Sequence, residues 1–424
     1  MNVLILGSGG REHTLAQKIS ESTNCNNLYV APGNAGTLLC AQNMDLNILN
    51  FDEIAHCIKT HDIHMLVVGP EAPLVEGIKD YFDEIPEFNT LKIIGPSQEG
   101  ARLEGSKERA KEFMKAHNVP TASYQSFDGK SLEAGKKFLT TLSPPFVLKA
   151  DGLAGGKGVL ILNDIEEAQQ ELENMLTNNK FGKASEKVVI EEFLDGIELS
   201  VFVLTDGKNY LTLPNAKDYK RIGEGDTGLN TGGMGAISPV PFADEEFMRK
   251  VDKRIVKPSI DGLQKEQIDY TGFLFIGLMK VGDDPFVVEY NVRMGDPETE
   301  VVIPRIKNDF LDVLNKTSQG KINEAELIID SKTAATVMIV SGGYPEAYEK
   351  GKAITGLDKV KDVFICHAGT KKENDQVFTN GGRVIAVTAF GDSFEMALQQ
   401  AYQNAEYINF DKKYYRKDLG KDLF

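Results

Sequence analysis

The sequence predicts an α/β protein built from an N-terminal domain with a Rossmann-like parallel sheet, a larger second α/β region and a small C-terminal α+β domain. Three observations support this prediction. The first hundred residues alternate short β-branched runs with helical patterns, which is typical of parallel sheets. Those runs end close to a glycine or proline. At 424 residues the chain is also too long for one hydrophobic core, so two to four domains are expected.

The composition is that of an ordinary folded protein, with 41% hydrophobic and 26% charged residues. The formal net charge of −16 argues against non-specific binding to nucleic acid or to an anionic membrane. The four cysteines are widely spaced, and we find neither a signal-peptide pattern nor a run apolar enough to span a membrane. We therefore expect a cytoplasmic protein with reduced thiols and no membrane or nucleic-acid partner. A monomer is expected as well, although no motif in the sequence determines the oligomeric state.

Four strands are expected in the first domain, at residues 2–6, 28–30, 65–68 and 92–94. Ligands of parallel sheets bind beyond the carboxyl ends of the strands. Three loops at those ends are rich in glycine and polar residues, namely GSGGREH at 7–13, APGNAG at 31–36 and GPEAPLVEG at 69–77. The N-terminal domain is therefore expected to bind a substrate along this edge.

The rest of the chain divides by pattern. A charged helical stretch runs from Ser97 to Val119 and ends at Pro120, and we place a domain boundary near Arg102. Later strands are expected at 335–340, 363–367 and 383–389, followed by a helix at 393–408. The expected domains are 1–102, 103–323 and 324–424, with a flap-bearing subdomain from residue 120 to residue 190.

The glycine loop after the first strand invites a dinucleotide-binding interpretation, but the match fails twice. The fingerprint requires a third glycine three positions after Gly9, where the chain has Glu12, and an acid after the second strand, where it has Ala31 to Asn34. A nicotinamide-dependent oxidoreductase is therefore a weak rival. A strand, a glycine turn and a helix N-terminus beside Arg11 suit the phosphate of a small substrate, and a simple tight turn is the alternative.

A second glycine-rich loop, KADGLAGGKGV, begins at Lys149. A P-loop is excluded because Gly152 and Gly156 are one residue too close and Gly158 replaces the hydroxyl residue. Both flanks look like strands, so we predict a flap carried by a hairpin. Its N–H groups and Lys157 would cover phosphates from above, while the lysine at the start of the loop reaches them from the side. An ordinary flexible hairpin is the alternative.

Two further segments are candidates for ligand binding. Residues 188–201 are predicted to form a strand, an Asp195-Gly196 turn and another strand; Glu191 and Glu192 would meet adenine, and Glu198 would accept hydrogen bonds from ribose. An exposed acidic hairpin explains this segment almost as well. Residues 218–239 contain six glycines among polar residues, which predicts a long binding loop or lid that contributes nothing to a core.

The most informative segment is VVEYNVRMGDPETE, residues 287–300. Side chains two apart on a strand share a face, so Glu289, Asn291 and Arg293 should point together. The first two suit a magnesium nucleotide and the arginine suits a transferring phosphoryl group. A solvated edge strand is the alternative, but the crowding of acids with Gly and Pro in the following turn disfavours it.

Together these motifs resemble the ATP-grasp ligases. The glycine flap, EEFLDGIE and EYNVRMGDPETE carry that resemblance, and GSGGREH, GPEAPLVEG, KADGLAGGKGV and GDTGLNTGGMGA are similar to the glycinamide ribonucleotide synthetases among them. The resemblance covers essentially the whole chain. It implies an N-terminal PreATP-grasp domain, a central ATP-grasp domain and a C-terminal domain. It also implies a ligase that joins glycine to 5-phosphoribosylamine with ATP, through glycyl phosphate.

The resemblance also implies roles for individual residues. The catalytic set is Arg293, Lys149 and Asp296. ATP is expected to contact Lys107, Lys149, Gly152, Gly155, Gly156, Lys157, Gly158, Glu191, Glu192, Leu194 and Glu198. Magnesium, or manganese, is expected at Glu289 and Asn291. Substrates are expected at Gly9, Gly10, Arg11, Glu12, Asn34, Glu71, Asp218, Lys220, Arg221, Asp226, Arg293 and Asp296.

One departure from the family pattern concerns the metal. Many ATP-grasp enzymes carry an acidic ligand on the preceding strand, but residues 273–280 contain no acid. Phosphates, water or another loop would then complete the shell. The rivals are another ATP-grasp ligase or carboxylase of purine metabolism, and a non-catalytic nucleotide sensor that binds Mg-ATP without amine-dependent turnover.

Overall fold

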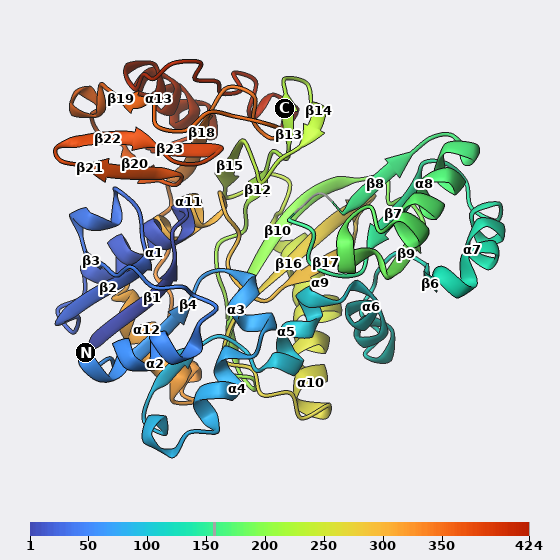
Figure 1. The fold of residues 1–424 in the computed structure, drawn as a ribbon, viewed down its shortest axis with the longest axis horizontal. Helices are drawn as coiled ribbons and strands as arrows, with labels where there is room; N and C mark the ends of the chain where they lie inside the picture. The colour runs from blue at the N-terminus through green and yellow to red at the C-terminus, as the bar shows by residue number, and fades with distance from the viewer. Residues whose placement is uncertain (156–157, 424) are drawn as a thin grey trace.

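A computed structural model describes residues 1–155 and 158–423. In Figure 1 the N-terminal domain and the C-terminal domain lie one above the other, and the flap-bearing subdomain projects from the opposite side of the central sheet. Among the helices in these ranges, none combines the length and apolar character needed to cross a membrane.

The N-terminal domain is a five-stranded parallel sheet in the order β3-β2-β1-β4-β5. Its strands are β1 (Asn2–Gly7), β2 (Asn27–Pro32), β3 (Gln42–Asn43), β4 (Met65–Val68) and β5 (Lys92–Ile94). Its helices are α1 (Gly10–Ser20), α2 (Phe51–Thr60), α3 (Glu71–Val75) and α4 (Ile78–Asp83). The four predicted strands and their parallel arrangement are confirmed. The two-residue β3 was not predicted because it is too short to give a pattern.

The charged helical stretch that follows is two helices instead of one. They are α5 (Gln98–Gly105) and α6 (Lys107–Ala116). Ser106 interrupts them with extended backbone, and its hydroxyl accepts a hydrogen bond from the Arg109 N–H at 3.1 Å. A serine that caps the next helix competes with continuation of the previous one, which explains the break.

The flap-bearing subdomain is an antiparallel sheet in the order β6-β9-β7-β8 with two helices against it. Its elements are β6 (Tyr124–Asp128), α7 (Leu132–Leu139), β7 (Phe146–Ala150), β8 (Val159–Leu162), α8 (Ile165–Asn178) and β9 (Lys187–Glu191). Strands β7 and β8 pair from Phe146–Leu162 to Lys149–Val159, so the predicted flap hairpin is confirmed. The subdomain has its own hydrophobic core, including Leu148, Leu172 and Ile190.

The central sheet is antiparallel, in the order β11-β10-β16-β17. Its strands are β10 (Ile197–Thr205), β11 (Tyr210–Thr212), β16 (Gly272–Val281) and β17 (Asp284–Asn291). Helices α9 (Glu245–Val251) and α10 (Lys257–Lys265) are joined by a π-helical turn at Asp252–Val256. Because β9 and β10 pair with different sheets, the acidic segment between them is a crossover, and the alternative of an acidic hairpin is wrong.

The C-terminal sheet has the order β12-β15-β18-β23-β20 and carries α13 (Phe394–Tyr407). Its strands are β12 (Lys217–Asp218), β15 (Gly235–Ser238), β18 (Thr333–Val340), β20 (Phe364–His367) and β23 (Arg383–Gly391). The remaining strands are β13 (Arg221–Gly223), β14 (Thr227–Asn230), β19 (Ala353–Ile354), β21 (Thr370–Glu373) and β22 (Gln376–Thr379). The connecting helices are α11 (Thr299–Val302) and α12 (Phe310–Ser318).

The prediction of one long loop at 218–239 is therefore wrong. The segment contributes β12 and β15 to the C-terminal sheet and folds back as the β13–β14 hairpin between them. Met234, Ala236 and Ile237 are fully buried, so the segment also contributes to the core. Its glycines hid this, because glycine carries no side chain to reveal an alternating pattern.

The N-terminal and central sheets share their hydrophobic cores. Leu4 and Leu6 of β1 cluster with Ile276 of β16, while Val3 and Ile5 cluster with Phe202 and Phe273 on the other side. A shared core fixes the two sheets as one body. Ligand-binding residues from both sheets therefore have fixed relative positions.

Candidate active site

A cleft of about 480 Å³ lies where the N-terminal domain, the flap hairpin, the central sheet and the C-terminal sheet meet. Polar and charged residues that we predicted for ATP, metal or substrate line it: Arg11, Glu71, Lys107, Asp218, Lys220, Glu289, Asn291, Arg293 and Asp296. So do Gly152, Gly155 and Gly158 of the flap. The fold thus brings together residues that lie up to 285 positions apart, as in the contact between the Arg11 N–H and Asp296 Oδ2.

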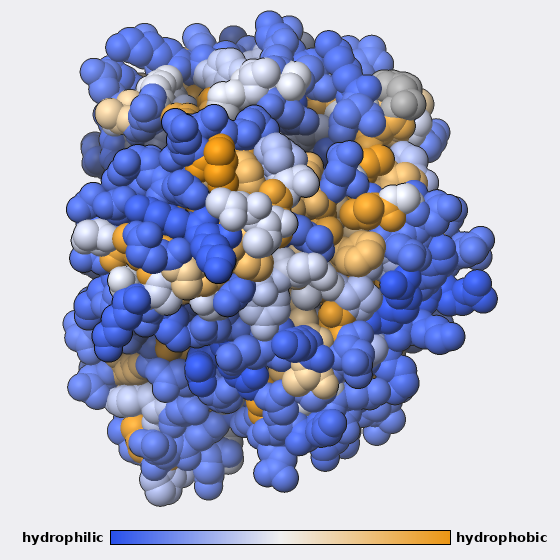
Figure 2. All heavy atoms as spheres, turned by 90° about the vertical axis from the view of Figure 1, so that its right-hand side faces the viewer, coloured by the Kyte–Doolittle hydropathy of each residue, from blue (hydrophilic) through white to orange (hydrophobic). Residues whose placement is uncertain are grey.

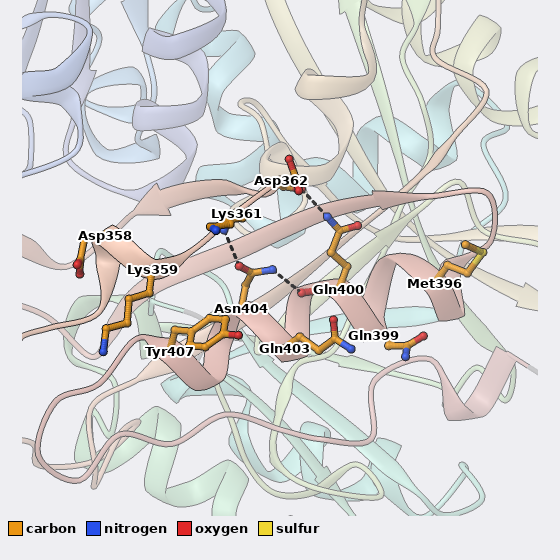
Figure 3. Close-up of a pocket in the computed structure, with 10 residues that line it drawn as sticks. All are labelled: Asp358, Lys359, Lys361, Asp362, Met396, Gln399, Gln400, Gln403, Asn404 and Tyr407. Atoms are coloured by element: carbon orange, nitrogen blue, oxygen red, sulfur yellow. Dashed lines mark hydrogen bonds between the residues drawn. The ribbon is translucent and has the colours of Figure 1, made fainter.

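A wider hollow of about 840 Å³ lies on the C-terminal domain, over α13 (Figure 3). Its polar side chains bind the neighbouring loop. Gln400 donates to the Asp362 carbonyl at 2.6 Å, and Asn404 accepts from the Lys361 N–H at 2.8 Å. These contacts fix the loop to the helix, so the inter-domain cleft is the better candidate for chemistry.

Strand β17 presents its acid and amide to the cleft, as the alternation predicted. Glu289 lies opposite Gly277 of β16, and Asn291 lies opposite Phe275. Burial alone would raise the pKa of Glu289, but Lys107, Lys220 and the cations beyond them lower it below its usual value. Glu289 is therefore an ionised carboxylate surrounded by positive charge, which is the state a metal ligand needs.

Arg293 follows the end of β17 and is held by two acids. Its Nη2 donates to Glu104 Oε1 at 2.7 Å, and its Nε lies 3.5 Å from Glu71 Oε2. Glu104 also accepts from the Val292 N–H at 2.8 Å, so one carboxylate fixes both the backbone and the guanidinium. A guanidinium fixed in this way is preorganised to meet developing negative charge.

Lys149 and Glu191, both expected to contact ATP, form a buried cluster under the cleft together with Lys111. Lys149 Nζ lies 2.9 Å from Glu191 Oε2, and Lys111 Nζ lies 3.1 Å from the same oxygen. Burial lowers the pKa of Lys111 to about 8. Glu191 Oε1 has no hydrogen-bond partner among the described residues. Unlike these two lysines, Lys107 forms no ion pair with a described residue, and it lines the cleft directly.

The flap forms the opposite wall of the cleft. Figure 2 views the face on which the flap-bearing subdomain projects, and apolar residues gather in its middle among hydrophilic ones. Leu153 of the flap and Phe193 of the crossover are 39% and 38% exposed, which is high for residues of this size. Gly155 has φ +56 and would have no atom within 4 Å of an added Cβ. Gly156 and Lys157 lie outside the described residues.

The carboxylates of Asp218 and Glu298 form the end of the cleft near the C-terminal sheet. Ser200 of β10 pairs with Ala216, which places Glu198 and Asp218 across from each other on one face. The Ser200 hydroxyl donates to Glu298 Oε1 at 3.2 Å, so the Glu298 carboxylate lies over the same face. Lys220 pairs with Glu198 at 2.9 Å, whereas Asp218 and Glu298 form no ion pair with a described residue.

Burial raises the pKa of both unpaired acids. The pKa of Glu298 is raised to about 7, because the charge of Asp218 adds to the effect of burial. The pKa of Asp218 is also raised, because burial, together with the charge of Glu198, outweighs the opposing charges of Lys220 and Lys217. A cationic ligand between these two carboxylates would relieve the effect.

The N-terminal glycine corner is closely packed. The Gly9 N–H donates to Glu12 Oε2 at 2.6 Å, and Arg11 Nε lies 2.5 Å from Glu12 Oε1. Asn34 donates to the carbonyls of Ser8 and His367, at 2.9 and 2.7 Å. Glu12 and Asn34 therefore support the corner from behind, and Arg11 is its member on the cleft surface.

Several predicted residues lie outside the cleft lining. Arg221 donates to the Gly228 carbonyl at 2.9 Å within the β13–β14 hairpin, and Asp226 Oδ1 lies 2.6 Å from Arg416 Nη1. Glu192 accepts from the Ser123 N–H at 2.8 Å. Among the remaining predicted residues, Glu198 faces Lys220, and Leu194 is half-buried on the crossover.

Other residues of the cleft escaped the sequence interpretation. The clearest are Glu104, Glu298 and Arg383. Arg383 Nη1 donates to the carbonyls of Asp296 and Gly232, at 2.6 and 2.5 Å. Glu104 lies inside a charged helix and gave no signal. Glu298 was visible as one of the crowded acids after Arg293, and Arg383 begins β23, where the sequence predicted a strand.

The donor set suits a metal that arrives with phosphate. No group of three His, Cys, Asp or Glu able to hold a metal occurs in residues 1–155 and 158–423. Glu289 and Asn291 supply two oxygen donors at the cleft, and the Asn291 Nδ2 is buried without a partner among the described residues. Magnesium commonly takes one or two protein oxygens and completes its shell with phosphates and water.

Three family models match this chain. Models of the N, ATP-grasp (A) and C domains of phosphoribosylglycinamide synthetase match residues 1–104, 105–299 and 334–422. The chain belongs to the phosphoribosylglycinamide synthetase family. The expected family and the three-part α/β fold are thereby confirmed.

Individual relatives agree with this assignment. A phosphoribosylamine–glycine ligase of Fusobacterium nucleatum is 44% identical over 424 residues, covering 99% of this chain and 98% of that protein. One from Yersinia pestis is 44% identical over 426 residues, with 99% and 98% covered. A bifunctional purine biosynthetic protein of Pichia angusta is 43% identical over all of this chain, which spans 54% of the length of that protein.

Solved structures show the same fold. The crystal structure of a phosphoribosylamine–glycine ligase from Thermotoga maritima superposes with a TM-score of 0.85 at 35% identity, covering 99% of this chain and 100% of that one. A biotin carboxylase from Campylobacter jejuni superposes with a TM-score of 0.73 at 16% identity, covering 97% and 92%. At that identity the second likeness concerns the fold alone.

Proposed function

We propose that this protein is an ATP-dependent ligase that joins glycine to 5-phosphoribosylamine, giving glycinamide ribonucleotide, ADP and phosphate. The observation that carries the proposal is the end of β17, where an ionised Glu289 and the amide of Asn291 face one cleft below a glycine flap. The fixed guanidinium of Arg293, just beyond the strand, lines the same cleft. That combination suits activation of a carboxylate by a nucleoside triphosphate.

The nucleotide is assigned to the flap side of the cleft. Lys107, which is free of ion pairs within the described residues, and Lys149 hold phosphates, and the Gly152 to Gly158 flap covers them. The base and ribose are assigned to the crossover, with Glu191, Glu192, Leu194 and Glu198. Magnesium or manganese is assigned to Glu289 and Asn291, where a bound ion would neutralise phosphate charge.

Glycine is assigned to the two unpaired acids. Its ammonium group fits between Asp218 and Glu298, which form no ion pair with a described residue, and its carboxylate then points toward Arg293. Lys220, already paired with Glu198, closes the same end of the cleft. A cation shared by two buried carboxylates favours an amino acid over a simple carboxylic acid.

Phosphoribosylamine is assigned to the N-terminal edge. Arg11 and Glu71 offer charge on the cleft surface, with Gly9 and Gly10 behind them and Glu12 and Asn34 supporting the corner. Asp296 lies between this edge and the glycine site. The side chains of Arg221 and Asp226 are bound elsewhere, so we assign them an indirect role: they hold the β13–β14 hairpin in place beside the substrate.

The chemistry follows from these positions. An oxygen of the glycine carboxylate attacks the γ-phosphorus of ATP and ADP leaves, while Arg293 neutralises charge on the transferred group. The phosphoribosylamine nitrogen then forms a bond to the carbonyl carbon, the carbon–oxygen bond to phosphate breaks, and the nitrogen loses a proton. The closed flap excludes water, which would otherwise hydrolyse the acyl phosphate.

A glycine-dependent ADP assay with freshly made phosphoribosylamine tests the proposal. We expect ADP release that requires both glycine and phosphoribosylamine, and none when formate or bicarbonate replaces glycine. ADP release with formate or bicarbonate instead would favour another ATP-grasp enzyme, and nucleotide binding without turnover would favour a sensor. We also retain a cytoplasmic monomer and the division at 1–102, 103–323 and 324–424 as part of the proposal; size-exclusion chromatography tests the monomer.

A further inference from the structure

Two carboxyl groups four residues apart lie at the edge of the cleft: Asp296 lines the cleft before α11, and Glu300 lies within that helix. Glu300 is completely buried, and both of its carboxyl oxygens lack a hydrogen-bond partner among the described residues. Oδ1 of Asp296 also accepts no hydrogen bond from a described residue, although Arg383 Nη2 lies 3.1 Å from it as an ion-pair partner. Buried polar atoms are almost always satisfied, so this group needs an explanation.

Both carboxyl groups face the glycine corner of the N-terminal domain. A Cβ added at Gly9 would lie 2.7 Å from Asp296 Oδ2, and one added at Gly10 would overlap Glu300 Oε1. Asp296 Oδ2 also accepts weakly from the Arg11 N–H at 3.4 Å. The two acids therefore lie side by side against two consecutive glycines.

One proton can satisfy two of the three unpaired oxygens. Two ionised carboxylates would repel each other and both would lack donors, whereas a protonated Glu300 can donate to Asp296. Burial and the charge of Asp296 raise the pKa of Glu300 well above its usual value. Burial opposes ionisation of Asp296 too, but Arg383 and Arg11 outweigh it and lower the pKa of that residue. The proton therefore belongs on Glu300.

We propose that Glu300 is a positioning residue that donates a hydrogen bond to Asp296, so that Asp296 stays an unprotonated acceptor aimed at the amine of phosphoribosylamine. This inference rests on the proposed function. When the amine nitrogen bonds to the carbonyl carbon and phosphate leaves, the nitrogen proton passes to Asp296, which lines the cleft. Glu300, closed off by Gly10 and Cys366, never touches substrate.

The test separates the amine step from the activation step. Hydroxylamine replaces phosphoribosylamine and traps glycyl phosphate as the hydroxamate. It reacts with acyl phosphates without a positioned base, so this reaction does not need Asp296. Both reactions are measured in the parent, in Glu300→Gln, whose amide can still donate to Asp296, and in Glu300→Leu, which cannot. Glu349→Gln, an exposed acid paired with Lys352, controls for loss of one carboxylate.

We expect Glu300→Gln to stay within about threefold of the parent in both reactions. We expect Glu300→Leu to lose about tenfold or more of phosphoribosylamine-dependent turnover while hydroxamate formation is unchanged. The loss should be smaller than the roughly 10²- to 10⁴-fold effect of a general base, because Asp296 itself is retained. Equal loss in both reactions would overturn the inference. If Glu300→Leu does not fold, Glu300→Gln and Asp296→Asn decide: a large selective loss must appear in Asp296→Asn and not in Glu300→Gln.

A pH profile gives a second readout. In the parent, turnover with phosphoribosylamine should fall on the acid side as Asp296 protonates. Glu300→Leu should move that limb to higher pH because it removes the donor, and Glu300→Gln should leave it in place. The other charged or titratable groups facing the pair are Arg11, Glu12, Glu71, Glu298, Cys366 and Arg383. Absence of glycine-dependent ADP with either nucleophile in the parent would refute the proposed function instead.

Discussion

The two sides of the cleft are built differently. The fixed wall joins the N-terminal, central and C-terminal sheets, and its glycines are closed in: acidic side chains from another domain occupy the space beside Gly9 and Gly10. The flap wall belongs to a subdomain with a separate core, and Gly155 there has no neighbour that a side chain would meet. Glycine allows close packing in the first wall and an open, left-handed backbone in the second.

This difference assigns each wall a separate part of the chemistry. The fixed wall contains charges held by named partners, such as Arg293 on Glu104 and Arg383 on Asp296. The flap contributes backbone groups and an exposed leucine, Leu153, which is free to change its contacts. Changes in the fixed wall should therefore affect binding, chemistry or folding, and changes in the flap should affect closure.

The largest effect is expected in the fixed wall for Glu289→Gln. Removing the ionised oxygen donor weakens the metal and phosphate site, so turnover should fall by about 100-fold or more. Steady-state ADP release measures it. Asp284→Asn at the exposed beginning of the same strand is the control and should change turnover little. Similar turnover in the two variants would mean that β17 does not carry the metal.

The second prediction concerns packing of the same wall. Gly10→Ala would push a methyl group into the buried Glu300 carboxyl, which cannot move outward, so stability should fall by about 1–3 kcal/mol. Urea unfolding measures the loss. Gly129→Ala serves as the matched control, because its added Cβ would make an ordinary contact at 3.7 Å to the Leu176 carbonyl. If both variants lose the same stability, the corner is less tightly packed than the structure indicates.

The third prediction uses the pH dependence of the glycine site. With a pKa raised to about 7, Glu298 is increasingly protonated below that pH and then cannot attract the glycine ammonium. The KM for glycine should therefore rise as pH falls below about 7, by at most about tenfold per pH unit. Glu298→Gln should have a higher KM with a flatter pH profile, while the KM for ATP stays constant. If the KM for glycine depends on pH as steeply in Glu298→Gln as in the parent, the glycine ammonium does not bind at Glu298.

The smallest effect on stability is expected in the flap. Gly155→Ala meets no atom, but its φ of +56 costs an alanine about 1 kcal/mol. ATP binding should persist, measured by isothermal titration, while ligation slows because closure is hindered. Gly182→Ala, also at positive φ with open space beside it, is the control for strain alone. Turnover equal in the two variants would show that the flap backbone is not involved in closure.

Periodicity and punctuation were enough to predict much of the fold. The parallel strands of the first domain, the β7–β8 hairpin and the face of β17 that carries Glu289 all follow from alternation and from glycine or proline at strand ends. These signals are local, so they survive in any tertiary setting. Local signals also placed most of the charged residues of the cleft.

The remaining features depend on long-range contacts. Strands β12 and β15 are short and glycine-rich, and only pairing with β18 makes them strands. Arg416 lies 190 residues from Asp226 and nonetheless binds it, which turns an expected substrate residue toward the C-terminal segment. Glu104 and Glu300 matter because of what they face after folding, and no spacing in the sequence shows that.

The order of strands in the C-terminal sheet limits how the gene could be divided. Two strands of that sheet are translated about a hundred residues before their neighbours, and the chain forms the β16–β17 hairpin in between. A fragment ending before residue 333 would expose the unpaired edge of β15, and a fragment starting there would lack two strands. Fusion partners and split-protein designs should therefore be joined at the chain ends.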